Sequence, residues 1–394
     1  MTTTRNTTEG LAAATYMVVL AVAVGFVLGV LTKVALWLYA RLIELIWQWL
    51  PEQIGLDAEA FIFMAVVLVV GGVIVGLGQR TLGYLPKPLE ETTADIAAGK
   101  GIDYRTIPAV LGNTVPALGA GAPLGPESGL IAVIGGIYFW LKERMDASAT
   151  HAFRVLTGRT DSEASKPWRF APSLIAGITV MAVFHWLPGG RGTSFVPEIG
   201  DVSEVGVLVL ALVAGIAGGV LGIAARRLEG RVRALKLFEA RPLISAPIAG
   251  LAVAALAIPS SLVLFSGTEG MSALFSGEAG AGELLYAGGA KLLAMLLVLA
   301  AGWKGGTIFP TMFIAGSLAV GVADLAGLDP VVLYAGAIAG AVAGHLRSVA
   351  LGAIISLLIV PPSLLVALVL GALGGSVALR GAARSDASLT SSSI

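Results

Sequence analysis

The sequence predicts an all-α, polytopic membrane protein with an inverted repeat and broken, re-entrant helices. The 394-residue chain is 56% hydrophobic and only 13% charged, with a mean hydropathy of +0.89, whereas soluble domains carry about 25% charged residues. Stretches such as 11–40, 205–225 and 243–265 are nearly free of charge and long enough to cross a bilayer. Glycine–proline breaks interrupt the apolar stretches in both halves, which is typical of inverted-repeat transporters.

Composition excludes several other classes of protein. The formal net charge is zero, so no nucleic-acid partner is expected, and the absence of cysteine excludes disulfides and thiolate metal sites. The three histidines lack carboxylate neighbours at metal-ligand spacing, and no nucleophile–base pattern is present. We therefore expect no metal, no cofactor and no enzymatic activity, with the lipid bilayer as the main partner.

Charge distribution predicts the topology. Segments 142–169 and 226–241 are rich in Lys and Arg, so the positive-inside rule places them and both termini in the cytoplasm. We expect an integral protein of the plasma (inner) membrane with five parts: a cytoplasmic N-terminal tail at 1–10, a first membrane repeat at 11–187, an extracellular loop at 188–204, a second repeat at 205–381 and a disordered C-terminal tail at 382–394.

Three glycine–proline breaks, at 83–86, 121–127 and 305–310, carry the functional prediction. Freed backbone groups cost several kcal/mol in hydrocarbon, so broken helices persist where they line a cavity, and their N-termini attract anions there. Pro126 and Pro310 mark two helix starts, and the backbone amides that follow them need no basic side chain to hold an anion. The sequence therefore predicts an anion site near the bilayer midplane.

The motifs at these breaks resemble those of the CLC chloride channels and proton-coupled chloride transporters. The family motifs Gly-Ser-Gly-Ile-Pro, Gly-Arg-Glu-Gly-Pro and Gly-Gly-Ile-Phe-Ala-Pro correspond here to Leu82-Gly-Tyr-Leu-Pro86, Ala122-Pro-Leu-Gly-Pro126 and Gly305-Gly-Thr-Ile-Phe-Pro310. The order and spacing of the motifs agree, across roughly residues 12 to 380. The resemblance implies anion transport, with chloride or a similar anion as the ligand, and a homodimer as the usual assembly.

The resemblance also indicates where this chain differs. The serine that binds the anion falls on Gly83, the gating glutamate falls on Leu124, and the late tyrosine of the inner gate has no counterpart in 370–379. The helix pair expected after Leu141 is missing, which shortens the first repeat, removes the inner proton-transfer glutamate and weakens the case for a homodimer.

Two residues are candidate gates. Leu124 is either a hydrophobic constriction that gates by dewetting or a packing leucine. Glu127 either stabilises its own helix as a first-turn acid, an effect of about 0.3–1 kcal/mol, or replaces the missing gate and competes with the anion. The predicted pore residues are Gly83, Tyr84, Gly121, Leu124, Gly125, Pro126, Glu127, Ser128, Gly306, Thr307, Ile308, Phe309, Pro310 and Thr311.

Two lysines and a glycine stripe leave further alternatives open. Lys291 either faces a cavity or snorkels to the interface, and Lys304 either attracts anions or snorkels. Gly215, Gly218, Gly219 and Gly222 form a stripe of small residues, for which packing inside one chain is preferred over dimerisation.

Passive movement of a small inorganic anion, most simply chloride, is the preferred function. Proton coupling is disfavoured because the residues that carry it in the family are absent here. The alternatives are a proton-coupled or other secondary active anion transporter, and a non-transporting membrane scaffold or subunit.

Overall fold

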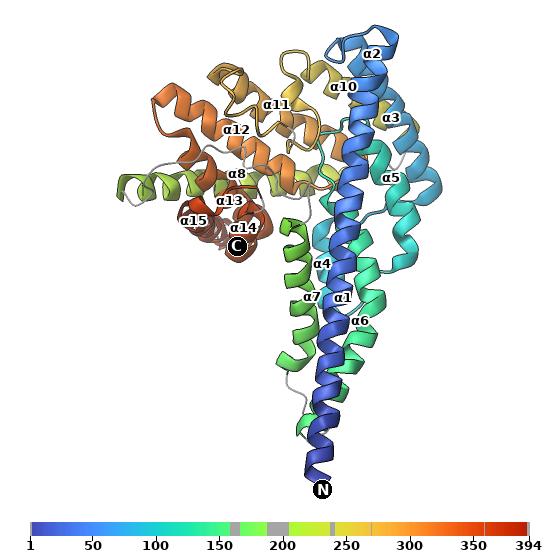
Figure 1. Cartoon of the computed structure of the whole chain (residues 1–394). Helices are drawn as coiled ribbons and strands as arrows, with labels where there is room; N and C mark the ends of the chain where they lie inside the picture. Colours follow the sequence, from blue (N-terminus) through green and yellow to red (C-terminus); the bar gives the residue numbers. More distant parts are fainter. Residues whose placement is uncertain are drawn as a thin grey trace. The chain divides into compact units, whose positions relative to one another are not determined.

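The computed structural model describes residues 2–157, 166–186, 205–236, 241–268, 270–357 and 359–391 (Figure 1). These residues are overwhelmingly helical and contain no β-strand, so the predicted all-α class is confirmed. Six helices among them are long and apolar enough to cross a membrane. The expected extracellular loop at 188–204 lies outside the described residues.

The chain divides into two compact units that interleave along the sequence. Unit 1 contains Met1–Arg41, Lys87–Val110 and Gly129–Arg191, and unit 2 contains Leu42–Pro86, Leu111–Ser128 and Gly192–Ile394. The units therefore do not follow the two halves of the sequence. The five parts expected from the charge pattern stay predictions.

Unit 1 is built from most of α1 (Thr2–Glu44), α4 (Leu89–Ala97), most of α6 (Glu127–Thr157) and α7 (Lys166–Trp186). Its core joins α1, α6 and α7 through small apolar side chains. The hydroxyl groups of Tyr138 and Ser173 also share a hydrogen bond. Only residues 158–165 separate α6 from α7, so the chain has no room there for the helix pair that the resemblance implies.

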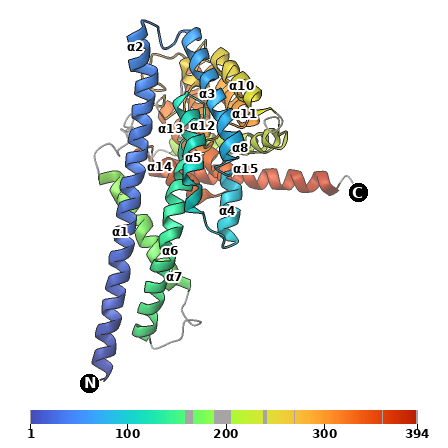
Figure 2. The same cartoon turned by 90° about the vertical axis from the view of Figure 1, so that its right-hand side faces the viewer.

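Unit 2 contains the remaining long helices and all three glycine–proline breaks. The segments of unit 2 that come first in the sequence contain α2 (Leu50–Ile54), α3 (Phe61–Leu82) and most of α5 (Ile107–Gly119). Its second part comprises α8 (Val205–Ala234), α10 (Pro242–Leu256), α11 (Ala281–Ala300), α12 (Ile308–Ala326), α13 (Pro330–Leu346), α14 (Val349–Leu357) and α15 (Leu365–Ser391). Helices α3 and α10 run side by side in both views (Figures 1 and 2).

Two expected segments end elsewhere in the structure. The predicted span 243–265 is wrong beyond Leu256, where α10 stops and a short 3-10 turn, Ser261–Val263, follows. Pro259 explains this end, because proline lacks the N–H that the next helical turn needs. Helix α15 includes residues 382–391, for which the Ser/Thr/Ala-rich composition predicts a disordered tail.

The glycine stripe of α8 packs inside unit 2. Gly215 lies against Gly371 of α15, and a Cβ at Gly218 would collide with the Ala337 carbonyl of α13. Helices α8, α13 and α15 are all in mutual contact. Small residues let such helices approach closely, so the preferred interpretation of this stripe as internal packing is confirmed.

Candidate anion site

The breaks at 121–127 and 305–310 lie against each other in unit 2. The Gly125 amide donates to the Gly306 carbonyl at 2.8 Å, and the Gly306 amide donates to the Gly125 carbonyl at 2.7 Å. This reciprocal pair is an isolated antiparallel bridge between segments far apart in the sequence. It brings the start of α6 next to the start of α12, as the prediction of converging helix N-termini requires.

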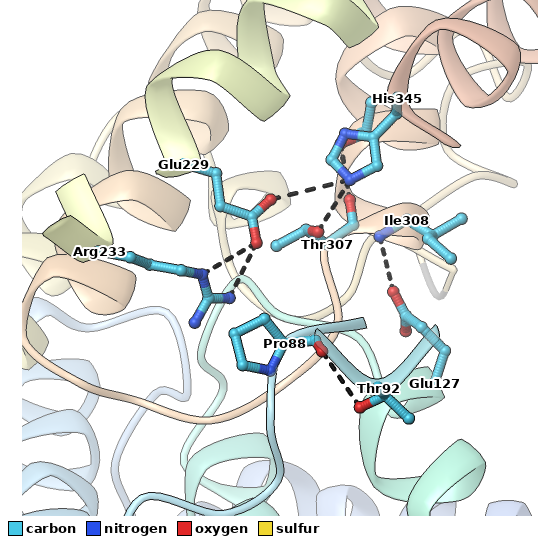
Figure 3. A network of polar contacts seen from close by, with 9 residues as sticks. Pro88, Thr92, Glu127, Glu229, Arg233, Thr307, Ile308 and His345 are labelled. Atoms are coloured by element: carbon cyan, nitrogen blue, oxygen red, sulfur yellow. Dashed lines mark hydrogen bonds and ion pairs between the residues drawn. The ribbon is translucent and has the colours of Figure 1, made fainter. Parts of the chain in front are cut away.

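Glu127 reaches across this junction to the amides of the other helix. Its Oε1 accepts a hydrogen bond from the backbone N–H of Ile308 at 2.7 Å (Figure 3). It also accepts one from the backbone N–H of Phe309 at 3.2 Å. Its Oε2 is buried and has no hydrogen-bond partner among the described residues. The first N–H groups of a helix have no partner within the helix and can bind anions, and here two of them bind the Glu127 carboxyl group.

Two glycines make room for this carboxylate. A Cβ added to Gly125 or to Gly306 would overlap with the carboxyl atoms of Glu127. The carboxylate therefore lies in a cradle between two backbones that only glycine allows to come so near. The interpretation of Glu127 as a first-turn acid does not account for these contacts, because the partner amides belong to α12.

Leu124 and Gly121 lie behind the junction and are buried. Leu124 has 0% exposure and packs against Gly305, where a Cβ would meet the leucine side chain. Gly121 has a positive φ of 83°, and its carbonyl accepts from the Phe265 amide at 3.0 Å. These contacts fit the packing interpretation of Leu124, while its role as a constriction stays a prediction.

The hydroxyl groups at the two helix starts have different environments. Thr307 precedes α12, and its Oγ1 shares a hydrogen bond of 3.1 Å with His345 Nε2. Thr311 donates to the Thr307 carbonyl at 2.6 Å, so its hydroxyl serves its own helix. Ser128 Oγ is buried without a hydrogen-bond partner among the described residues. Pro126 immediately precedes α6, whereas α12 begins before Pro310, at Ile308.

The break at 83–86 follows α3. Gly83 ends this helix with φ 80°, and the side-chain amide of Asn113 donates to the carbonyls of Gly83 and Leu85, each at 2.8 Å. Tyr84 is 41% exposed, and its ring lies 5.4 Å from the ammonium group of Lys304. Lys304 itself is buried, which does not fit the snorkelling alternative.

Sequence reasoning missed a polar cluster beside the break at 305–310. Glu229 and Arg233 of α8 form an ion pair of 2.9 Å, and Glu229 also approaches His345 of α13 at 3.8 Å (Figure 3). The spacing of Glu229 and Arg233, four residues apart on a helix, is the only signal for it in the sequence. His345 lies in the last turn of α13.

Comparison with known proteins identifies the family. The model of the voltage gated chloride channel family matches residues 162–380, more than half of the chain. The chain belongs to this family. The family assignment supports anion transport, and with the six apolar helices it makes the chain an integral membrane protein.

Individual relatives agree with the family assignment. The proteins named "Putative ion-transport protein YfeO" from Salmonella schwarzengrund and Salmonella typhimurium are each 27% identical over 313 residues, which cover 70% of this chain and 72% of the relative. A slow cyanobacterial Cl⁻/H⁺ antiporter has a similar structure, with a TM-score of 0.71, 16% identity and coverage of 92% of this chain and 93% of that one.

A CLC-type fluoride/proton antiporter has the same fold. Its TM-score is 0.70 at 18% identity, with coverage of 92% of this chain and 95% of that one. At these identities the likeness establishes the fold, and the predicted CLC-like architecture is confirmed.

Proposed function

We propose that the chain moves a small inorganic anion, chloride in the first instance, along a path through the Glu127 cradle. The amides of Ile308 and Phe309 are the proposed ligands, since they already hold one negative oxygen. A chloride ion in the place of the carboxylate would keep the same two N–H donors and the same favourable end of the α12 dipole. No cofactor and no chemical catalysis are part of this proposal.

Glu127 is the proposed gate of this path. The ionised carboxylate competes with the anion, because both need the two α12 amides and because like charges repel at close range. Protonation removes the charge, weakens both hydrogen bonds and lets the side chain leave the cradle. Flux is therefore expected to rise as the pH falls.

Chloride flux from liposomes containing the purified protein tests this proposal. We expect Glu127→Gln to raise flux at neutral pH by about tenfold, which corresponds to about 1.4 kcal/mol of removed competition, and to abolish the pH dependence. Glu52→Gln, in exposed α2, is the matched control and should leave flux unchanged. Unchanged flux in Glu127→Gln at every pH would contradict the gate. Zero flux from well-folded wild type and Glu127→Gln alike would favour the non-transporting scaffold.

Anion/proton exchange is the second candidate. It is favoured by one observation, that the occupant of the amide site is itself a protonatable group. Passive movement stays preferred, because Leu124 replaces the gating glutamate of the family and the late tyrosine is absent. Uptake of chloride against its gradient, driven by a pH gradient alone, would establish exchange and overturn the passive proposal.

Location and assembly complete the proposal. The basic end of α8, with Arg231 and Arg233 in its last turn, is proposed to face the cytoplasm of a plasma-membrane protein, together with both chain termini. A homodimer is proposed from the family, and the glycine stripe takes no part in it because its residues are buried within one chain.

A further inference from the structure

A helix that breaks within a membrane protein exposes two kinds of backbone group. Its N–H groups attract anions, whereas its carbonyl oxygens repel anions and attract cations. A break therefore favours anions over cations only where its carbonyl groups are occupied or turned away from the ion. At the three breaks of unit 2, donors from other elements of the fold bind carbonyl groups in or directly before the break.

The break at 83–86 is held by Asn113 of α5. Its Nδ2 donates to the carbonyls of Gly83 and Leu85, each at 2.8 Å. A side-chain amide has two N–H donors, so both are spent on this one break. Asn113 is 0% exposed, and its own oxygen faces α3, where a Cβ added to Gly78 would collide with it. The side chain therefore presents its donors to the break and turns its acceptor to a neighbouring helix.

Each of the other two breaks has its own side-chain donor. Trp47 Nε1 donates to the carbonyl of Gly119, at the end of α5, at 3.0 Å. Gln79 Nε2 donates from α3 to the carbonyl of Gly302, shortly before the break at 305–310, at 2.7 Å. Trp47 is 6% exposed and Gln79 is 3% exposed, so water does not compete strongly for these carbonyl groups.

Backbone amides occupy further carbonyl groups at the same breaks. The carbonyl of Gly121 accepts from the Phe265 amide at 3.0 Å, and those of Gly125 and Gly306 accept from each other's amides. These carbonyl groups thus have donors that the fold fixes in place. By contrast, the first amides of α12 bind the carboxyl group of Glu127, a side chain that an ion can replace in the proposed gate.

We propose that Asn113, Trp47 and Gln79 make the anion path selective for anions over cations. Each binds a carbonyl oxygen that is otherwise free to turn toward the broken helices, so that the ion meets backbone N–H groups in preference to carbonyl groups. The three side chains act through the backbone and are positioning residues. This inference rests on the proposed function, because it requires that an anion passes between the breaks.

The competing interpretation is that these bonds serve stability alone. A buried carbonyl group without a donor is unfavourable wherever it lies, so their loss would loosen the fold. A loosened fold loses chloride flux without gaining a preference for cations. A carbonyl group released at a break can instead rotate toward the path, where it weakens the binding of chloride and helps a cation to pass.

Liposomes loaded with potassium chloride separate the two interpretations when chloride efflux and the uptake of rubidium, a potassium analogue, are measured together at acidic pH. We expect Asn113→Leu, which frees two carbonyl groups, to raise the ratio of rubidium to chloride flux about tenfold, equivalent to about 1.4 kcal/mol of altered selectivity. Trp47→Phe keeps an aromatic ring and frees one carbonyl group, so the ratio should rise by a smaller factor, about threefold.

Tyr286→Phe is the matched control. The hydroxyl of Tyr286 donates to the carbonyl of Leu256 at 2.8 Å, so this variant also frees the carbonyl group of a helix end. That helix end, on α10, lies outside the three breaks. Tyr286→Phe should therefore leave the flux ratio at the wild-type value.

An unchanged ratio in Asn113→Leu and Trp47→Phe, or an equal rise in Tyr286→Phe, would overturn the selectivity role. Either result leaves the proposed function intact, since that function is judged by chloride flux through the wild type. If the wild type moves no chloride, the proposed function fails and this inference fails with it. Should Asn113→Leu aggregate in size-exclusion chromatography, Trp47→Phe and Gln79→Met, which keeps the side-chain length, decide the question.

Discussion

Two of the ionisable side chains enclosed in unit 2, Glu127 and Lys291, have different surroundings. Lys291 is 0% exposed, and its ammonium group donates to the carbonyls of Leu262, Val263 and Leu264 at 2.7, 3.3 and 2.6 Å. An ammonium group has three donors, and all three are used. Glu127 uses one oxygen and leaves the other unpartnered among the described residues.

The two groups differ in how completely they are bonded. The ammonium group of Lys291 is fully bonded, whereas among the described residues the carboxyl group of Glu127 is not. Of the two alternatives for Lys291, snorkelling is wrong, because its ammonium group is buried, binds the chain that follows α10 and lies 4.4 Å from the Phe313 ring. These bonds give Lys291 a structural role. Glu127 keeps one buried oxygen without a partner among the described residues, which fits the proposal that its carboxyl group leaves the cradle when it is protonated.

The largest effect is expected from Lys291→Met. This change keeps the length of the side chain but leaves the carbonyls of Leu262, Val263 and Leu264 buried without their donor. At about 1–3 kcal/mol for each unsatisfied group, the free energy of unfolding should fall by roughly 3 kcal/mol or more. Chemical denaturation in detergent micelles measures it.

An exposed lysine supplies the control for this prediction. The side chain of Lys100 is 71% exposed and pairs with Asp95 at the surface, so Lys100→Met should leave the stability unchanged. If Lys291→Met proves as harmless as the control, Lys291 is no structural charge, and the contrast with Glu127 loses its basis.

A smaller effect is expected at the glycine cradle. In Gly306→Ala the added methyl group takes the volume of the Glu127 carboxyl group, and hence that of the anion proposed to replace it. Chloride flux should fall about tenfold, or about 1.4 kcal/mol, both with Glu127 and in the Glu127→Gln background. Liposome flux assays at one acidic and one alkaline pH measure it.

Gly289 is a matched control, because it lies on α11 with no heavy atom within 4 Å of an added Cβ. Gly289→Ala should leave flux unchanged. Normal flux in Gly306→Ala would mean that the anion does not pass through the cradle.

The sequence predicted the helix starts well because their cause is local. Glycine ends regular structure and a following proline favours the first turn of a helix. Both signals can be read from the residues up to Pro126 and Pro310. The length and hydrophobicity of the apolar stretches likewise predict membrane helices without tertiary information. The break at Pro259 was missed because a proline near the end of an apolar stretch is compatible with either a loop or a kink.

The bonding inside the site could not be predicted in the same way. Glu127 lies in the first turn of α6, where an acid normally stabilises its own helix, and only the pairing of Gly125 with Gly306 brings it to the α12 amides. The contact of Glu229 with His345 also joins residues distant in sequence. Such contacts depend on tertiary packing, which a single sequence does not specify.

The smallest effect is expected from Ser128→Ala. Ser128 Oγ is buried next to Glu127 in the chain and has no partner among the described residues, so its removal loses no hydrogen bond. The free energy of unfolding should stay within about 0.5 kcal/mol of wild type. Ser317→Ala is the comparison, because Ser317 Oγ donates to the Leu284 carbonyl at 2.6 Å and its loss should cost about 1 kcal/mol. If Ser128→Ala proves the more destabilising of the two, the Ser128 hydroxyl has a partner, and the contrast between Ser128 and Ser317 is wrong.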